Sequence, residues 1–393
     1  MGNVPHLRFP EFSGEWKKCK FGDIATGFDY GMNAAAKPFD GENKYIRITD
    51  IDEASSQYLY DDVVSPDGEL GDSYLVKEND ILLARTGAST GKSYLYRNSD
   101  GKLYFAGFLI RANIYKHNSY FVFSQLHTHR YKKWISVMSA RSGQPGINSQ
   151  EYASFPLYTT SLQEEDKIAS FLKLLDERIA TQNKIIEKLQ SLIKGLIDDI
   201  ITLKCGQLVA FETLYSKAGE GGTPTTSNTE FYDNGSIPFI KIDDLSNKYL
   251  SANKDYITEL GLKKSSAWLI PTHSIIYSNG ATIGAISINK YPVCTKQGIL
   301  GIVPNTNIDV EFLYYFMQSS YFQKEVERVV TEGTMKTAYL KDINHIKCPI
   351  PDLDRQKEIS HLLSVLSLKE DVERQLLQKY KIQKQYLLRK MFI

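Results

Sequence analysis

The chain has 393 residues, of which 42% are hydrophobic and 24% are charged, and its formal net charge at pH 7 is +1. This length accommodates two domains of ordinary size together with extended helices, and the composition is that of a soluble globular protein. The near-zero net charge neither favours nor excludes nucleic acid as a partner, so a basic binding face would have to be local.

Scattered cysteines and histidines exclude several kinds of site. Cys19, Cys205, Cys294 and Cys348 form no CxxC pair, so neither a zinc site nor a disulfide framework is indicated. The histidines show no metal-ligand spacing, and no Ser-His-Asp or paired-carboxylate arrangement stands out. We find no signal peptide and no apolar run of membrane-spanning length. We therefore expect a cytoplasmic protein with reduced thiols, no metal and no catalytic residues of its own.

The first part of the chain predicts a β-rich domain. Residues 45–51 alternate as a half-buried strand, and residues 80–84 form the short apolar run of a buried strand. The second run leads directly into a Gly-rich loop at 85–93. Residues 103–115 indicate further strand, and residues 120–139 indicate a helix. We assign this domain to residues 1–160.

Residues 161–204 predict one very long helix. It opens with a capping box, Ser161 to Glu164, and would span about 60 Å at 1.5 Å per residue. Its apolar residues follow one another at steps of three and four, which is a heptad seam. The seam consists of Ile168, Leu172, Leu175, Ile179, Gln182, Ile186, Leu189, Ile193, Leu196 and Ile200. Such a narrow seam needs a partner helix. Its one polar member, Gln182, either fixes the register or marks a docking site.

The second half of the chain repeats the order of the first. Residues 239–245 correspond to 45–51, and residues 274–284 correspond to the strand and Gly-rich loop near 81–91. A second helix at 351–393 corresponds to the first, with Ile168 and Ile359 lying 191 residues apart. Its seam positions are Ile359, Leu363, Leu366 and Leu377. A repeat this long indicates a duplicated domain rather than a solenoid.

We therefore predict an α+β fold in which two repeated β-rich domains, 1–160 and 205–350, are joined by two long antiparallel helices. The helices, 161–204 and 351–393, would form a coiled-coil spacer and relate the halves by a pseudo-twofold axis. The strands match between the copies, whereas the early loops differ. A shared framework with divergent loops suits a binding domain that was duplicated to recognise two targets.

A phosphate-binding loop is the main competing interpretation of residues 87–93. A Walker A loop has four residues between its glycines, whereas three separate Gly87 from Gly91. The corresponding loop of the second copy also lacks Lys92. We therefore favour a Gly-rich turn that approaches another polymer. The enzyme alternative predicts nucleotide turnover that Lys92→Ala abolishes.

Several strings resemble the specificity (S) subunit of type I restriction–modification systems. They are Pro-x-Leu-Arg-Phe-Pro-x-Phe…Trp at 5–16, Gly-Gly-Thr-Pro-Thr-Thr and the following strand at 221–245, and Ser-Asn-Gly-Ala-Thr-Ile-Gly at 278–284. Pro156 and Pro351 precede the helices as that pattern requires. The resemblance covers essentially the whole chain, although the first copy lacks the Gly-Gly-Thr-Pro string.

The resemblance implies two target-recognition domains, each of which reads one half of a bipartite, asymmetric double-stranded DNA sequence. It implies two modification subunits, which methylate adenine N6 with S-adenosylmethionine, and restriction subunits, which use ATP and Mg²⁺. The S subunit itself would carry no catalysis and no cofactor. Its helices would set the spacing between half-sites and dock the modification subunits.

Candidate DNA contacts are polar side chains on strands and Gly-rich loops, because phosphate contacts position a protein and base-edge contacts specify sequence. They are Arg47, Arg85, Thr86, Ser89, Thr90, Lys92, Gln144, Thr223, Thr225, Thr226, Lys241, Ser278, Asn279, Thr282, Lys296, Gln297 and Lys336. Arg47 and Lys241 occupy equivalent strand positions and should point away from the core. In the alternative interpretation these two are solvated strand residues, and the loop residues hydrogen-bond their own turns.

A second class of function stays open from sequence alone. Two protein-binding domains on a coiled-coil scaffold, without nucleic acid, would have the same composition. That alternative predicts that charge changes in the Gly-rich loops leave DNA association untouched.

Overall fold

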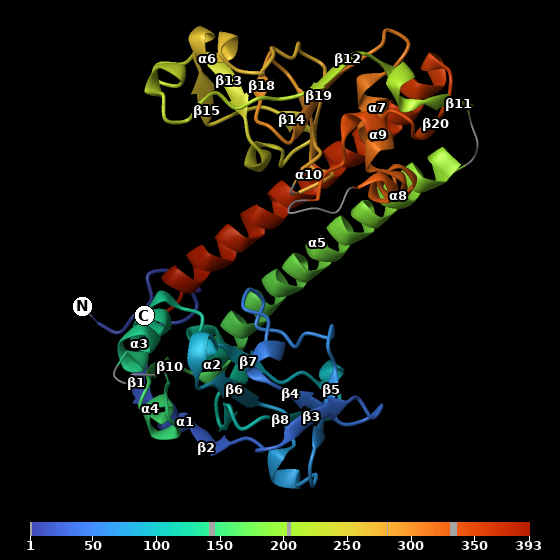
Figure 1. Ribbon diagram of the computed structural model, residues 1–393. Coiled ribbons are helices and arrows are strands. Elements are labelled where there is room, and N and C mark those ends of the chain that lie inside the picture. The colour runs from blue at the N-terminus through green and yellow to red at the C-terminus, as the bar shows by residue number, and fades with distance from the viewer. Residues whose placement is uncertain (1, 141–145, 203–205, 281, 331–335) are drawn as a thin grey trace. The chain divides into compact units, whose positions relative to one another are not determined.

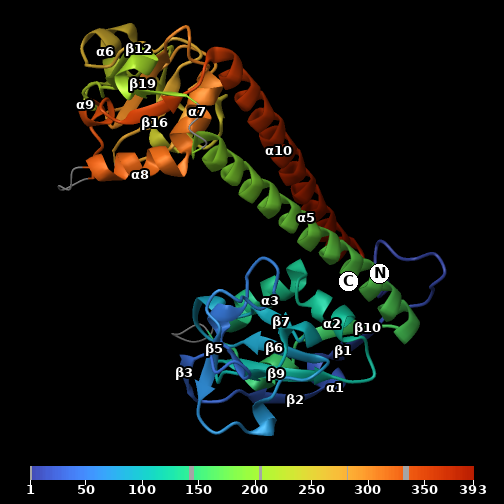
Figure 2. The same cartoon turned by 90° about the vertical axis from the view of Figure 1, so that its right-hand side faces the viewer.

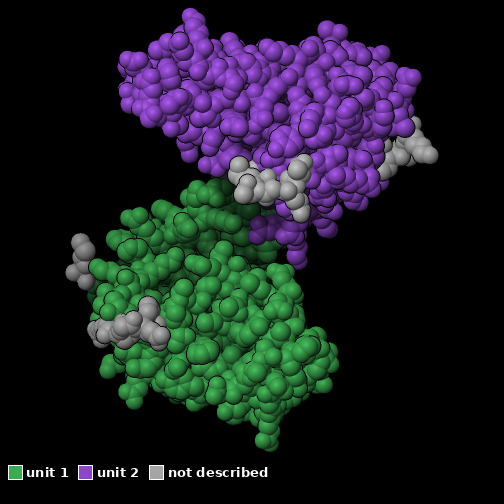
Figure 3. Space-filling model, viewed as in Figure 1, with its two compact units in different colours: residues 1–182, 376–393 green, residues 183–375 purple. Residues whose placement is uncertain are grey.

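The computed structural model describes residues 2–140, 146–202, 206–280, 282–330 and 336–393 (Figure 1). The chain divides into two compact units, coloured separately in Figure 3. Unit 1 contains residues 1–182 and 376–393, and unit 2 contains residues 183–375. Each long helix therefore contributes one part to each unit. None of the described helices is long and apolar enough to cross a membrane.

Unit 1 is built on a four-stranded antiparallel sheet in the order β2-β9-β6-β7. Two small sheets, β3-β5 and β4-β8, and the pair β1-β10 complete its strands. The elements of this unit are β1 (Lys17–Lys20), α1 (Phe21–Ile24), β2 (Ala25–Tyr30), β3 (Ala35–Pro38), β4 (Lys44–Ile46), β5 (Val64–Asp67), β6 (Asp80–Ala84), β7 (Ser93–Leu95), β8 (Leu103–Phe105), β9 (Leu109–Ile114), α2 (Ser119–Gln125), α3 (His129–Ser139), α4 (Ser149–Ala153) and β10 (Pro156–Thr159).

The central strand β6 is buried on both faces, as its continuous apolar run predicts. Ile81 and Leu83 join a core with α2 and α3, whereas Leu82 and Ala84 join a second core with the β4-β8 pair. The prediction for 103–115 is confirmed as β8 and β9, whereas the single helix predicted over 120–139 is two helices, α2 and α3. The sheet is thus covered on both faces, and its loops are left to form the exposed surface.

The prediction of one strand over 45–51 was wrong in part. Only Lys44–Ile46 is strand, and Ile48–Asp50 forms a 3-10 turn. The turn forms because the Asp50 carboxylate accepts a hydrogen bond from the Arg47 backbone N–H at 2.8 Å. A side chain that caps the backbone in this way offers an alternative to the strand ladder.

In unit 1 the beginning of α5 (Leu162–Thr202) packs beside the end of α10 (Leu353–Lys390). Leu172 of α5 and Leu387 of α10 are buried in the same core, and Lys384 forms an ion pair with Asp176 at 2.5 Å. The N-terminal arm adds a bidentate contact, because Arg8 binds the buried carboxylate of Glu164 at 2.7 and 2.8 Å.

Unit 2 repeats this architecture with a five-stranded sheet in the order β12-β19-β16-β17-β14. A three-stranded sheet, β15-β13-β18, and the pair β11-β20 complete it, and α7 and α8 lie against one face of the larger sheet (Figure 2). Its elements are β11 (Gln207–Ala210), β12 (Tyr215–Glu220), β13 (Ile237–Ile240), β14 (Tyr249–Leu250), β15 (Asp255–Ile257), α6 (Glu259–Lys263), β16 (Ile275–Ser278), β17 (Ile286–Asn289), β18 (Cys294–Thr295), β19 (Ile299–Pro304), α7 (Val310–Gln318), α8 (Ser320–Val329), α9 (Leu340–Ile343) and β20 (Lys347–Ile350).

In unit 2 the end of α5 packs beside the beginning of α10. Ile197 of α5 shares a core with Ile359 and Leu363 of α10. The beginning of each helix thus meets the end of the other, so the helices run antiparallel, as predicted. With the repeated β-rich units, this confirms the predicted α+β fold class.

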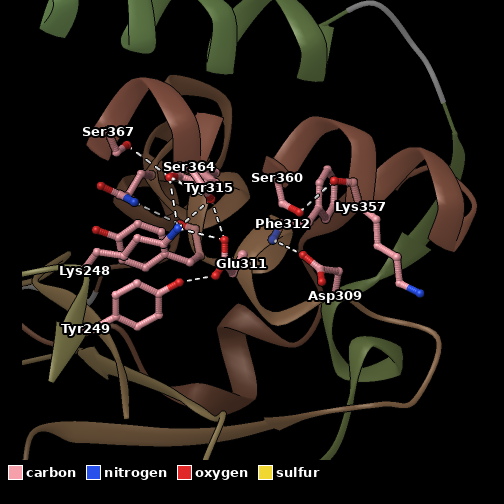
Figure 4. Close-up of polar contacts among 12 residues, drawn as sticks. Lys248, Tyr249, Asp309, Glu311, Phe312, Tyr315, Lys357, Ser360, Ser364 and Ser367 are labelled. Atoms are coloured by element: carbon pink, nitrogen blue, oxygen red, sulfur yellow. Dashed lines mark hydrogen bonds and ion pairs between the residues drawn. The ribbon is translucent and has the colours of Figure 1, made fainter. Parts of the chain in front are cut away.

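A polar network joins the sheet of unit 2 to α10 (Figure 4). The ammonium of Lys248 donates to Glu311 at 2.9 Å, to Tyr315 at 3.1 Å and to Ser364 of α10 at 2.8 Å. The Ser364 hydroxyl donates to the same carboxylate at 2.5 Å, and the Tyr249 hydroxyl donates to its other oxygen. Because a lysine ammonium has three donors, Lys248 is fully satisfied while it is mostly buried.

Candidate nucleic-acid interface

The Gly-rich loop of unit 1 leaves the end of β6 and returns to β7. Gly87 and Gly91 have positive φ values of 66° and 92°, which favour glycine. The Arg85 backbone N–H donates to Phe108 at 3.1 Å, and the Ile147 N–H donates to the Arg85 carbonyl at 2.9 Å. The loop is therefore anchored to two other segments at the point where it leaves the sheet.

The candidate side chains on this loop are half-buried. Thr86, Ser89 and Lys92 lie on its surface, and the Thr90 hydroxyl donates to the Gly87 carbonyl at 2.8 Å. Thr90 thus forms a hydrogen bond within its own turn, which is the alternative to a DNA contact. The other three side chains are only partly exposed.

A hollow of about 640 Å³ lies beside the loop and is lined by residues from β2, β4 and the β8–β9 turn. Tyr30, Phe108, Arg47 and Arg85 are among its lining residues, and Thr49 stands at its exposed side. Phe108 is 57% exposed and Tyr30 is 42% exposed. The hollow therefore combines two exposed aromatic rings with two guanidinium groups.

Arg47 lines this hollow but is held by acidic neighbours. Its guanidinium contacts Asp50 and Asp62 at 2.8 and 2.9 Å, and these carboxylates raise its pKa further above the ordinary value. Lys241, its counterpart in unit 2, is exposed and forms an ion pair with Asp255 at 2.8 Å. Both side chains point outward, as expected, but neither presents an unpaired charge.

Ser278 and Asn279 are not where we predicted them. Both side chains are buried, because the loop after β16 is tied to the segment before α9. The Ala338 backbone N–H donates to the Asn279 carbonyl at 2.9 Å, and the Asn279 side-chain amide donates to the Ala338 carbonyl at 3.1 Å. These two residues therefore support the loop from inside and offer no side chain to a groove.

The other candidates in unit 2 lie on its surface. Five of them are exposed: Thr225, Thr226, Thr282, Lys296 and Gln297. Thr223 is half-buried, and its hydroxyl accepts the Gln297 backbone N–H at 3.4 Å, which joins the early loop to the turn before β19. Lys336 is exposed beside a separate hollow of about 470 Å³. Gln144 lies outside the described residues.

The seam positions of both helices face inward along their length. In α5 the buried members are Ile168, Leu172, Leu175, Gln182 and Ile186, and the half-buried members are Ile179, Leu189, Ile193 and Leu196. In α10, Ile359 and Leu363 are buried, and Leu366 and Leu377 are half-buried. The side chain of Ile200 is outside the described residues.

Sequence reasoning missed the aromatic part of the unit 1 hollow. Tyr30 and Phe108 were passed over because aromatic residues in strands usually belong to the core. Phe108 follows Gly107 in a short β8–β9 connection, and that turn context is the one signal that could have suggested exposure. Across the described parts of the chain, no group of three or more His, Cys, Asp or Glu side chains could hold a metal ion.

Residues 13–191 and 215–381 match the family described as type I restriction modification DNA specificity domain. The specificity subunit of the Escherichia coli type I restriction enzyme EcoR124I/EcoR124II is 30% identical over 172 residues, which are 42% of this chain and 42% of that protein. The chain thus spans less than half the length of this relative. The MjaVIII specificity subunit of Methanocaldococcus jannaschii is 23% identical, over 91% of this chain and 86% of that protein.

The fold is also similar to a crystal structure of the type I restriction–modification S subunit from M. genitalium. The TM-score is 0.60, with 16% sequence identity and 99% of each chain covered. At this identity the likeness concerns the fold alone. The family match covers both copies of the repeat and most of each long helix. The chain therefore belongs to the family of type I restriction modification DNA specificity domains.

Proposed function

We propose that this chain is the DNA-recognition subunit of a type I restriction–modification complex. Each unit reads one half of a bipartite, asymmetric target, and the antiparallel helices set the spacing between the halves. One observation carries this proposal: two copies of one sheet framework present different side chains at equivalent loops. Arg85 and Thr86 are partly exposed in unit 1, whereas their counterparts Ser278 and Asn279 are buried in unit 2.

Different loops on one framework give different sequence preferences, because bases are read by individual side chains at the groove edge. A symmetric reader would recognise a palindrome, whereas two unlike domains recognise two unlike half-sites. The proposed target is therefore asymmetric, with a fixed gap that neither unit reads.

The helices carry a second apolar stripe that faces outward. Phe171 and Leu174 of α5 are 38% and 59% exposed, and their counterparts Leu362 and Val365 of α10 are 47% and 52% exposed. Phe9 of the N-terminal arm packs edge-on against Phe171 in unit 1. An exposed stripe at helical spacing suits a partner helix. We propose that these stripes dock two modification subunits, one on each copy of the repeat.

In the proposed assembly the partner subunits catalyse the reactions. The modification subunits would methylate adenine N6 with S-adenosylmethionine, and restriction subunits would use ATP and Mg²⁺. This chain would contribute the choice of sequence and no reacting group.

Selection from random DNA tests the proposal. The complex of this chain with its modification subunit is incubated with random duplexes of 40 base pairs, and the retained duplexes are sequenced. We expect enrichment of two short, unlike motifs at one constant separation. Enrichment of a single motif, of a palindrome, or of no sequence would overturn the proposal.

A matched pair of variants tests the docking surface. Val365→Glu should abolish co-purification with the modification subunit, because it places a charge in the centre of the stripe. Lys357→Glu, at an exposed position near the beginning of α10 and off the face that carries Leu362 and Val365, should preserve it. Circular dichroism of both variants checks that the helices are retained.

A further inference from the structure

Arg85 differs from three other arginines of unit 1, each of which is bound by a carboxylate. Arg8 and Arg47 are bound by carboxylates, and Arg111 contacts Asp29 at 2.9 Å. The Arg85 guanidinium forms no ion pair with any described residue, and its Nε is buried without a hydrogen-bond partner. Its charge is therefore not neutralised by a carboxylate of the described residues.

Tyr30 fixes the position of this guanidinium. The ring of Tyr30 lies 4.7 Å from the Arg85 guanidinium carbon, and the Tyr30 hydroxyl accepts the Ser149 backbone N–H at 3.3 Å. Hydrogen bonding to Ser149 and the nearby charge of Arg85 lower the pKa of Tyr30. The stack holds the guanidinium against a ring that is itself attached to α4.

The surroundings of Arg85 leave room for a ligand on two sides. The 640 Å³ hollow lies on the side of Tyr30 and Phe108, and a second hollow of about 390 Å³ lies on the side of Asn148 and Glu151. The backbone of Arg85 is held at both its N–H and its carbonyl, as described above. A fixed backbone and a stacked guanidinium reduce the entropy that would be lost when a ligand is bound.

Arginine offers two parallel N–H groups, which match the N7 and O6 acceptors of guanine in the major groove. In unit 2 the corresponding residue is Ser278, whose side chain is fully buried. The arginine at this loop position is therefore specific to unit 1. Arg85 should therefore affect recognition at one position of one half-site.

Building on the proposed function, we propose that Arg85 reads a guanine in the half-site bound by unit 1, and that Tyr30 is a positioning residue that holds the guanidinium in the plane of that base. The alternative for an unpaired arginine is a phosphate contact, which carries no sequence information. Replacement of Arg85 changes the recognised sequence if Arg85 contacts a base, and leaves it unchanged if Arg85 contacts a phosphate.

The test is the motif recovered by selection from random duplexes, measured for the wild-type complex and for variants of residue 85. Arg85→Ala should remove the preference for guanine at one position, with discrimination there falling by about tenfold or more, and leave the other positions and the spacing unchanged. Arg85→Lys should also relax that position, because lysine keeps the charge but lacks the planar fork. Lys132→Ala, an exposed cation on α3, is the control and should leave the motif intact.

Variants of Tyr30 test whether this residue positions the Arg85 guanidinium or only stabilises the folded domain. Tyr30→Phe keeps the ring and should retain the guanine, whereas Tyr30→Leu loses the stack and should relax the same position as Arg85→Ala. Thermal unfolding of each complex checks that the domains remain folded.

A phosphate contact would give a different result. Arg85→Ala would then weaken binding to all sequences alike and flatten its salt dependence, Arg85→Lys would restore binding, and the motif would not change. That result overturns the role of Arg85 and leaves the proposed function standing. A wild-type complex without any bipartite motif overturns the proposed function itself.

Discussion

Glu165 and Gln356, which lie 191 residues apart, make the same hydrogen bond in the two copies of the repeat. Glu165 accepts the backbone N–H of Asn118 at 2.9 Å, and Gln356 accepts the backbone N–H of Asp309 at 2.9 Å. Asn118 and Asp309 are the N-caps of α2 and α7. Each long helix thus holds its own domain at the same point, although one acceptor is a carboxylate and the other an amide.

The two acceptors are not interchangeable, and Gln356→Glu should destabilise unit 2. The Gln356 amide also donates to the carbonyls of Asn307 and Pro351 at 3.2 and 2.8 Å. A buried carboxylate would face both carbonyls without a donor, at a cost of about 2–3 kcal/mol. Chemical denaturation measures this loss. Gln375→Glu, at an exposed position of α10, is the control. Equal stability of the two variants would contradict the structural role.

Lys248→Ala should destabilise unit 2 because it leaves the partly buried Glu311 carboxylate without its cation. We expect a loss of about 2 kcal/mol or more in the free energy of unfolding, since removing one partner costs more than removing both. The double variant Lys248→Met with Glu311→Gln should recover part of that loss. A double variant that is no more stable than Lys248→Ala would show that the pair is not coupled.

His127 should make unit 1 less stable in mild acid. Its Nδ1–H donates to the Phe123 carbonyl at 2.9 Å and its Nε2 accepts the Ser56 hydroxyl at 2.9 Å, so the ring is held in its neutral form. Burial, together with the charge of Lys384, lowers its pKa from 6.5 to about 4. The unfolded state therefore binds more protons between these pH values, and the free energy of unfolding falls as the pH falls through this window, by about 3 kcal/mol.

Comparison of wild type with His127→Gln isolates this contribution from other titrating groups. The stability difference between the two proteins should change between pH 7 and pH 4.5, with the wild type losing more. A difference that is constant across this range would contradict the assignment.

Insertion of one heptad after Gln182, with a compensating heptad in α10, should lengthen the gap between the half-sites and leave both half-site sequences unchanged. Seven residues keep the seam in register, because the apolar residues repeat with that period. The motif selected from random duplexes measures the gap. An altered half-site sequence with the original gap would contradict the role of the helices as a spacer.

The sequence predicted best what depends on local periodicity. The seam from Ile168 to Leu196, the buried strand β6 and the repeat itself follow from spacing alone, because apolar residues on one face must be buried wherever that face lies. The antiparallel pairing of the helices followed from the order of domain and helix in the repeat. These features needed no knowledge of contacts between distant residues.

The candidate site was predicted less well, because side-chain availability depends on distant partners. Arg47 is held by Asp62, and Asn279 is buried by Ala338, which is 59 residues away. Tyr30 and Phe108 are exposed only because β2 and the β8–β9 turn end at the same hollow. The charge and type of a residue do not show which distant side chain or backbone group it contacts, or whether it lines a hollow.

We propose that this chain chooses a bipartite DNA sequence for an adenine methyltransferase. The most direct measurement is the map of methylated adenines in cellular DNA when this chain is expressed with its candidate modification subunit, and with each protein alone. We predict methylation of adenine N6 within a single motif of two unlike half-sites at a constant gap, only when both proteins are present. No new methylation despite a soluble complex of the two would contradict the claim and favour a protein-binding scaffold.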